Sequence, residues 1–99
     1  MSVFAKRLKE ARKIAGLSQE KLGVAAGIDE MSASARMNQY ERGKHDPDYL
    51  TVMRIAKVLH VPEGYFYTMD DEAAWLAVTF HRASPQAREQ IIAVARSIS

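Results

Sequence analysis

Apolar residues recur at helical spacing along the whole chain, and no segment alternates apolar and polar residues over the length of a strand. The first segment therefore predicts a helix over about residues 2–15. Gly16 follows it, where helices commonly end in a left-handed conformation. The pattern favours an all-α fold. The apolar stripe of this first helix consists of Val3, Phe4, Leu8, Ala11 and Ala15.

The next segment predicts a short second helix. Ser18 is placed to cap its free amides, and Gly27 is placed to end it. We expect its inner side to consist of Leu22, Ala25 and Ala26.

A third helix follows, and its body lies over residues 35–42, with Gly43 after it. Met37 and Tyr40 fall on its inner side. The pattern leaves its first residue open, because three side chains could each cap it, namely Asp29, Ser32 and Ser34.

A fourth helix is expected over about 48–59, and a short fifth helix is expected over 61–67, with Pro62 near its first turn. The fourth helix has a broad apolar side made of Leu50, Val52, Met53, Ile55, Ala56 and Leu59.

Two more helices follow an acidic joint at 70–72. The sixth is expected over about 71–82, and the seventh begins after Ser84, with Pro85 in its first turn. We expect residues 1–68 to form one domain and residues 69–99 to form a helical extension. The extension carries two apolar stripes, one of Trp75, Leu76 and Phe80 and one of Ala87, Ile91, Val94, Ala95 and Ile98.

The amino-acid composition excludes several classes of protein. The apolar fraction of 47% suffices for a core, and no apolar run approaches the roughly 20 residues that span a membrane. The chain has no cysteine, which excludes disulfides and thiolate metal sites, and its start does not resemble a signal peptide. A reducing compartment fits best, so we expect a cytoplasmic protein without contact to membranes.

The charged residues are distributed slightly unevenly along the chain. The net charge is +2, and the excess of basic residues lies in the first 68 positions, while the last 31 are slightly acidic. Small basic domains are often merely soluble, so this balance favours a nucleic-acid partner only slightly.

Several motifs stand at intervals that together are quite specific. They comprise Arg12, the run from Gly16 to Leu22, the run from Ala26 to Ile28, the run from Tyr40 to Lys44, Pro47, Leu50, the run from Ile55 to Leu59, Val61, Pro62 and Phe66. From about Phe4 to Tyr67 the chain thus resembles the helix-turn-helix domain of the phage repressor and Cro proteins, the Xre family. The resemblance implies a five-helix domain that binds double-stranded DNA.

One spacing departs from this family. About ten residues usually separate the glycine after the second helix from the glutamate that ends the third, whereas fourteen separate Gly27 from Glu41. About four residues are therefore inserted near Asp29–Ser32. They form either a longer turn or an extra turn of the third helix.

The resemblance places the third helix in the major groove, with its non-core face toward the bases. Gln can pair with adenine, Arg with guanine, and Ala can touch a thymine methyl group. Arg42, at the end of the helix, is better placed for a phosphate. The expected DNA-binding residues are Gln19, Ser34, Ala35, Arg36, Asn38, Gln39, Arg42 and Lys44.

Three of the matching positions, Gln19, Arg12 and Glu41, have specific roles in the family's domain. Glutamine at position 19 would brace a DNA phosphate and a residue of the third helix, at a helix terminus whose free amides also attract phosphate. Arg12 and Glu41 would form a partly buried ion pair that pins the third helix to the first.

Other chemistry finds little support in the sequence. The three histidines are scattered and lack the spacing of metal ligands, and no catalytic grouping or glycine-rich phosphate loop stands out. We therefore expect no enzyme, no metal and no cofactor.

The expected function is sequence-specific transcriptional regulation, by repression, as a homodimer on two half-sites, because one short helix reads few base pairs. The extension over 69–99 is the candidate for dimerisation, with Trp75 packed on the domain. Two alternatives stay open: an antitoxin that also binds a toxin protein, and a protein-interaction module that has lost DNA binding.

Overall fold

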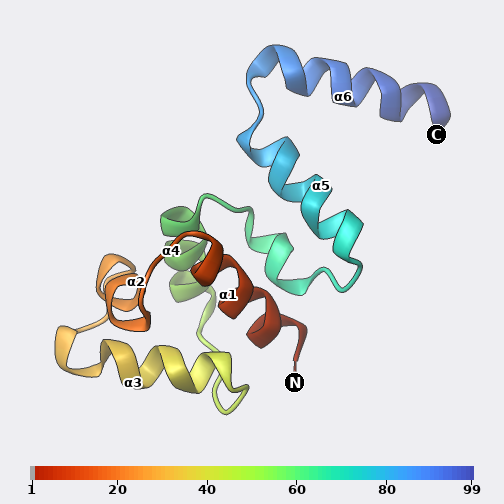
Figure 1. The fold of residues 1–99 in the computed structure, drawn as a ribbon. Helices are drawn as coiled ribbons and strands as arrows, with labels where there is room; N and C mark the ends of the chain where they lie inside the picture. The colour runs from red at the N-terminus through yellow and green to blue at the C-terminus, as the bar shows by residue number, and fades with distance from the viewer. Residues whose placement is uncertain (1) are drawn as a thin grey trace.

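The computed structural model describes residues 2–99, and these residues form helices with no strand among them. The all-α fold expected from the sequence is confirmed, and the short fifth helix is of the 3-10 type. Figure 1 shows the elements in chain order: α1 (Val3–Ile14), α2 (Gln19–Ala25), α3 (Glu30–Glu41), α4 (Tyr49–Leu59), η1 (Glu63–Tyr67), α5 (Asp71–Arg82) and α6 (Pro85–Ile98).

The helix boundaries follow from local chemistry. The Ser18 hydroxyl accepts a hydrogen bond from the Lys21 amide at 3.0 Å, and the Ser84 hydroxyl accepts one from the Ala87 amide at 3.1 Å, as the sequence predicts. Gly27, after α2, has φ +90°, in the left-handed region where a side chain would be strained. The chain can therefore turn sharply between α2 and α3.

Asp29 sets the beginning of α3. Its carboxylate accepts a hydrogen bond from the Met31 amide at 3.0 Å, and the helix runs from Glu30. Of the two forms expected for the segment near Asp29–Ser32, the structure has the helical one, because residues 30–32 belong to the first turn of α3. At 1.5 Å per residue, residues 30–32 contribute about 4.5 Å to the length of the helix.

The core lies where α1, α3, α4 and η1 converge, with α2 packed across α3. Leu8, Leu22, Met37, Ile55 and Phe66 are fully buried there. Met37 and Tyr40 lie on the inner side of α3, as predicted. The core thus holds α2 and α3 against the remaining helices of the domain.

Four apolar residues expected to face inward are exposed instead. Ala15 lies after the last residue of α1, and Ala25 lies on the outer side of α2. Leu50 and Met53 flank the buried stripe of α4, because only one side of that helix meets the core. Amphipathic spacing overestimates the buried face in a small domain, where each helix has few neighbours.

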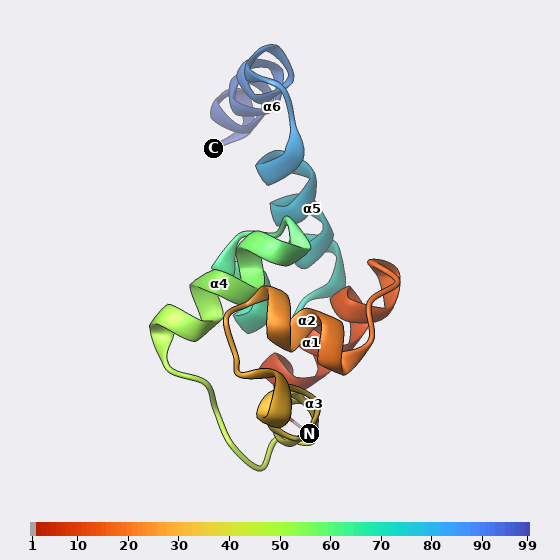
Figure 2. The same ribbon diagram turned by 90° about the vertical axis from the view of Figure 1, so that its left-hand side faces the viewer.

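The two C-terminal helices differ in how they meet the domain. Ala74 of α5 is buried in the core and Val78 packs against it, whereas α6 buries no residue. Figures 1 and 2 show α6 standing away from the other helices at the end of an elongated molecule of 50 × 25 × 22 Å. The boundary expected between 68 and 69 stays a prediction, although α5 shares the core of the preceding helices.

The expected packing of Trp75 on the domain is wrong for the single chain. Its side chain is 67% exposed, because α5 contacts the domain through the neighbouring Ala74.

No helix within residues 2–99 is long and apolar enough to cross a membrane.

Candidate nucleic-acid interface

The contact between α2 and α3 is unusually close. A Cβ placed on Gly23 would lie 2.8 Å from the Cβ of Ala33 and 3.1 Å from its carbonyl oxygen. Both residues are buried. Only glycine therefore lets the backbone of α2 lie this near to α3, and this pair sets the distance between the two helices.

α3 has one buried face and one exposed face. The buried face consists of Ala33, Met37, Tyr40 and Glu41. The exposed face carries the side chains that the sequence proposes for DNA, and Lys44 continues it into the following loop. All of these residues are exposed, namely Ser34, Ala35, Arg36, Asn38, Gln39, Arg42 and Lys44.

The loop after α3 is held close to its end. The backbone amides of Lys44 and His45 donate hydrogen bonds to the Gln39 carbonyl, at 3.0 and 3.5 Å. A shallow hollow beside this loop is lined in part by Arg36 and Gln39. Lys44 is thereby kept near the C-terminal end of the exposed face.

Arg12 reaches from α1 to the end of α3. Its Nε donates a hydrogen bond to Glu41 Oε2, and its Nη2 donates to Glu41 Oε1 at 3.0 Å. Its Nη1 donates to the Leu17 carbonyl at 2.9 Å, which also secures the turn before α2. The hydrogen bond with Glu41 raises the pKa of Arg12 above its already high ordinary value, so the guanidinium keeps its charge.

Gln19 lies at the first position of α2 and reaches across to α3. Its Nε2 donates to Asn38 Oδ1 at 3.2 Å and to Glu41 Oε1 at 3.3 Å. The structure thus brings Gln19, Asn38 and Glu41 together in one polar cluster at the edge of the exposed face. The Gln19 side chain is half-buried, and the free backbone amides at the start of α2 lie beside it.

These pairings decide the sign of the charge on α3. Glu41 is buried and paired with Arg12, so the acid within the body of the helix is neutralised. Arg36, Arg42 and Lys44 remain exposed. The face is therefore positive toward its C-terminal end, which suits a phosphate backbone.

Comparison with known proteins gives the context of this arrangement. A family model described as a helix-turn-helix domain matches residues 5–72. The chain belongs to the helix-turn-helix family. The "Crystal structure of transcriptional regulator BswR" is one similar solved structure, with 42% sequence identity and a TM-score of 0.88 over 98% of this chain and 94% of that one. A comparison with curated protein sequences found no match.

The matched residues include α2 and α3, the two helices that the sequence resemblance assigns to the motif, and in such a motif the second helix is the recognition helix. The N-terminal part of a recognition helix commonly meets base edges. Here that part includes the first turn from Glu30, which places Met31 at the tip.

Met31 is a candidate contact that sequence reasoning missed. Its side chain is 93% exposed, and it shares a helix side with Ala35 and Asn38, four and seven residues later. The sequence contained an indication of this position, since Asp29 is one of the three residues that could cap the third helix. Choosing it would have placed Met31 on the exposed side of the first turn.

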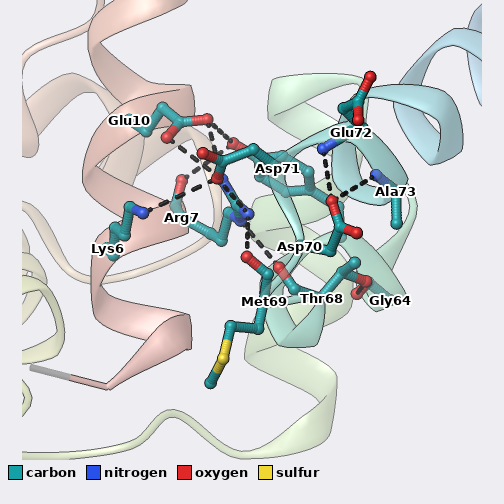
Figure 3. Close-up of polar contacts among 11 residues, drawn as sticks. Lys6, Arg7, Glu10, Gly64, Thr68, Met69, Asp70, Asp71, Glu72 and Ala73 are labelled. Atoms are coloured by element: carbon teal, nitrogen blue, oxygen red, sulfur yellow. Dashed lines mark hydrogen bonds and ion pairs between the residues drawn. The ribbon is translucent and has the colours of Figure 1, made fainter.

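Arg7, outside the motif, was also missed. It is 2% exposed, and Figure 3 shows its guanidinium between the ends of η1 and α5. Its Nε donates to the Thr68 carbonyl at 3.0 Å, and its Nη2 donates to the Met69 carbonyl at 2.9 Å and to Asp71 Oδ1 at 2.8 Å. Its place in the sequence, between Phe4 and Leu8 in the apolar stripe, was the available signal.

The same cluster includes Glu10 and Tyr65. The Tyr65 hydroxyl donates to Glu10 Oε1 at 3.0 Å, and the Glu10 carboxylate also lies 3.4 Å from Arg7 Nη1. Burial, followed by the hydrogen bond to Glu10, raises the pKa of Tyr65. The hydrogen bond from Arg7, followed by the nearby charge of Lys6, lowers the pKa of Asp71. This cluster fixes the start of α5 on α1.

The groups that bind metals are dispersed. Within residues 2–99, no three His, Cys, Asp or Glu side chains lie close enough to hold a metal ion.

Proposed function

We propose that this protein is a transcriptional regulator of the Xre type that binds duplex DNA and represses transcription. The observation that carries the proposal is the exposed, basic face of α3, whose internal acid Glu41 is paired with Arg12 beneath it. The 42% identity to the transcriptional regulator BswR over nearly the whole chain supports it.

In this proposal α3 enters the major groove. Arg36 and Gln39 read base edges, because guanidinium and amide groups match guanine and adenine there. Asn38 is tied to Gln19, so these two act together at the edge of the helix. Ser34, Ala35 and the tip residue Met31 lie nearer the N-terminal end, where the first turn of α3 adds to the contact surface.

Arg42, Lys44 and Gln19 contact phosphates in the same proposal. Arg42 lies at the end of α3 and Lys44 in the loop after it. Gln19 lies at the N-terminus of α2, where free backbone amides favour an anion. These contacts fix the register of the protein on DNA, and they carry no sequence information of their own.

The proposed regulator acts as a homodimer. A single recognition helix covers one half-site, and two half-sites about 34 Å apart supply the affinity and specificity of an operator. The C-terminal pair α5 and α6 supplies the dimer contact, because it carries the exposed apolar residues Trp75, Leu76 and Ile98.

The decisive experiment is selection of bound sequences from a random duplex pool, followed by a salt titration on the selected operator. We expect a two-fold symmetric sequence and an affinity that falls steeply with salt. Equal binding to all sequences, or no binding at low salt, would favour the protein-interaction module instead. Copurification with a small protein partner would favour the antitoxin.

A further inference from the structure

A cleft of about 600 Å³ runs between α1 and α5, outside the DNA-binding helices. Its apolar lining includes Ala11, Val61, Ala74 and Val78, and Trp75 and Ile14 stand at its edge. Trp75 and Ile14 are 67% and 75% exposed. The single chain thus leaves an apolar cleft open beside two large exposed apolar side chains, an arrangement that usually marks a contact site.

The charged groups at this cleft are already paired within the chain. Arg7 is bound to Asp71 and to backbone carbonyls. Arg82 donates to the His60 and Leu59 carbonyls, at 2.9 and 3.2 Å. An occupant therefore gains little by bringing a charge and gains most by bringing apolar side chains.

α6 is the other incomplete surface. It has 14 residues, and none of them is buried. Ile91, Val94 and Ile98 follow each other at spacings of three and four, so they share one side of the helix. An isolated helix of this length is only marginally stable in water, so α6 requires a surface to pack on.

α6 is also held away from the cleft of its own chain. Arg88, in its first turn, donates to the Phe80 and His81 carbonyls at the end of α5, at 3.0 and 2.8 Å. The Arg88 guanidinium lies over the Phe80 ring, 4.9 Å from its centre. These contacts fix the angle at which α6 leaves α5, and Figure 1 shows α6 standing apart from α1, with α5 between them.

We propose that the cleft between α1 and α5 receives α6 of a second copy of this chain, and that the two copies exchange these helices symmetrically. The inference deepens the proposed function, on whose dimer it rests. One two-fold operation then covers both incomplete surfaces of both copies, because each chain carries one cleft and one uncovered helix.

Both uncovered surfaces contribute apolar side chains to the proposed contact. Trp75 alone exposes about two thirds of a side chain that can bury about 150–250 Å². Each copy contributes both its α6 face and its cleft, so two docking sites share the roughly 800 Å² per partner that a standard interface buries. α6 spans about 21 Å and α5 about 18 Å, so the helix matches the length of the wall that receives it.

Trp75 is the only tryptophan of the chain, so its fluorescence reports on the cleft without a label. We expect sedimentation to show a dimer at micromolar concentration. On dilution through the dissociation range, the emission maximum should shift to longer wavelength as Trp75 returns to water. Emission typical of exposed tryptophan throughout, in a protein that sediments as a dimer, overturns the proposal.

Two variants change the two halves of the contact separately. Trp75→Glu alters the cleft, and Val94→Glu alters α6; both side chains are exposed, so the fold should remain, as circular dichroism can verify. Each variant alone should weaken dimerisation by about 100-fold or more, since the altered site occurs twice in the dimer. Leu50→Glu, at an exposed position of α4, is the matched control and should dimerise like the parent.

Mixing the two variants tests the exchange itself. In a mixed dimer, the intact α6 of the Trp75→Glu copy meets the intact cleft of the Val94→Glu copy, so one of two docking sites survives. We expect the mixture to associate more tightly than either variant alone. No gain on mixing, or normal dimerisation of Trp75→Glu, rejects exchange and favours α6 packing on α6.

The readout separates this inference from the proposed function. Association is measured without DNA, and operator binding is measured on the same samples. A monomeric protein that still selects a DNA sequence would reject the α6 exchange and support the proposed DNA-binding function. A dimer with exchanged α6 helices that binds no DNA would support the exchange and reject the proposed function.

Discussion

Gly23 of α2 lies so close to Ala33 of α3 that an added methyl group would stand 2.8 Å from the Ala33 Cβ and within 3.1 Å of its backbone oxygen. Because part of the obstruction is backbone, α3 itself must move to admit a side chain. The position of the proposed recognition helix thus depends on the absence of one carbon atom in its neighbour.

Gly23→Ala should therefore destabilise the domain by about 1–2 kcal/mol, as overpacking outweighs the gain in helix propensity. Thermal unfolding measures this, and operator affinity should fall as well because α3 is displaced. Gly64→Ala is the control, since nothing lies within 4 Å of its added carbon. Equal melting temperatures for the two variants would show that α3 yields freely.

Glu41→Gln tests the ion pair with Arg12. The change removes the negative charge from a buried partner and leaves the guanidinium charged, which should cost about 2–3 kcal/mol and lower the melting temperature by roughly 10 °C or more. Glu20→Gln, at an exposed position of α2, should melt like the parent. A parent-like Glu41→Gln would mean that the pair contributes little to positioning α3.

Acid should loosen the joint between α1 and α5. The hydrogen bond from Arg7 holds the pKa of Asp71 below its ordinary value of about 3.9. A carboxyl group whose pKa is depressed by folding stabilises the fold above its unfolded-state pKa. This contribution is lost as the pH falls through the folded-state pKa. Asp71→Asn should thus melt below the parent at pH 7, and the difference should shrink below about pH 4. A difference independent of pH would contradict the charge-based account.

The residues proposed for phosphates and for bases should separate by salt dependence. Arg42→Ala or Lys44→Ala should weaken binding to all sequences and reduce the slope of log affinity against log salt by about one. Arg36→Ala or Gln39→Ala should instead relax preference at particular base pairs, by about 1–3 kcal/mol each. If all four variants bind the selected operator like the parent, α3 is not the reading element.

Met31 should contribute to base preference through an apolar contact. Met31→Ala should lower discrimination at one outer position of each half-site, where a thymine methyl group is the expected partner. Repeated sequence selection with the variant measures this. Met53→Ala, another exposed methionine but on α4, is the control and should select the parent's sequence.

Much of this architecture was accessible from the sequence because it depends on local rules. Ser18, Gly27 and Ser84 act through hydrogen bonds or backbone conformation within a few residues, so their roles can be recognised without a fold. The approach of Arg12 to Glu41 joins residues 29 positions apart, and only the family resemblance brought the two side chains together beforehand.

What the sequence did not indicate depends on which neighbours exist in space. Trp75 and Ala74 are adjacent and both apolar, yet only Ala74 faces the core. Arg7 interrupts an apolar stripe and would ordinarily be placed at the surface, but three backbone or side-chain acceptors from residues 68–71 converge on it. Periodicity assigns a side of a helix and cannot tell whether another element covers that side.

α1 carries two arginines, five residues apart, that each hold another helix: Arg7 is buried and Arg12 is partly buried. Arg7 holds α5, the support of the proposed dimer, and Arg12 holds α3, the proposed reading helix. Because each residue turns an α-helix by about 100°, a single insertion between these arginines would rotate one of them against the other. Under the proposed function, the number of residues between the two arginines therefore sets the angle between the recognition helix and the dimer contact. Leu8 and Ala11 are buried between the two arginines, so the core itself maintains this spacing.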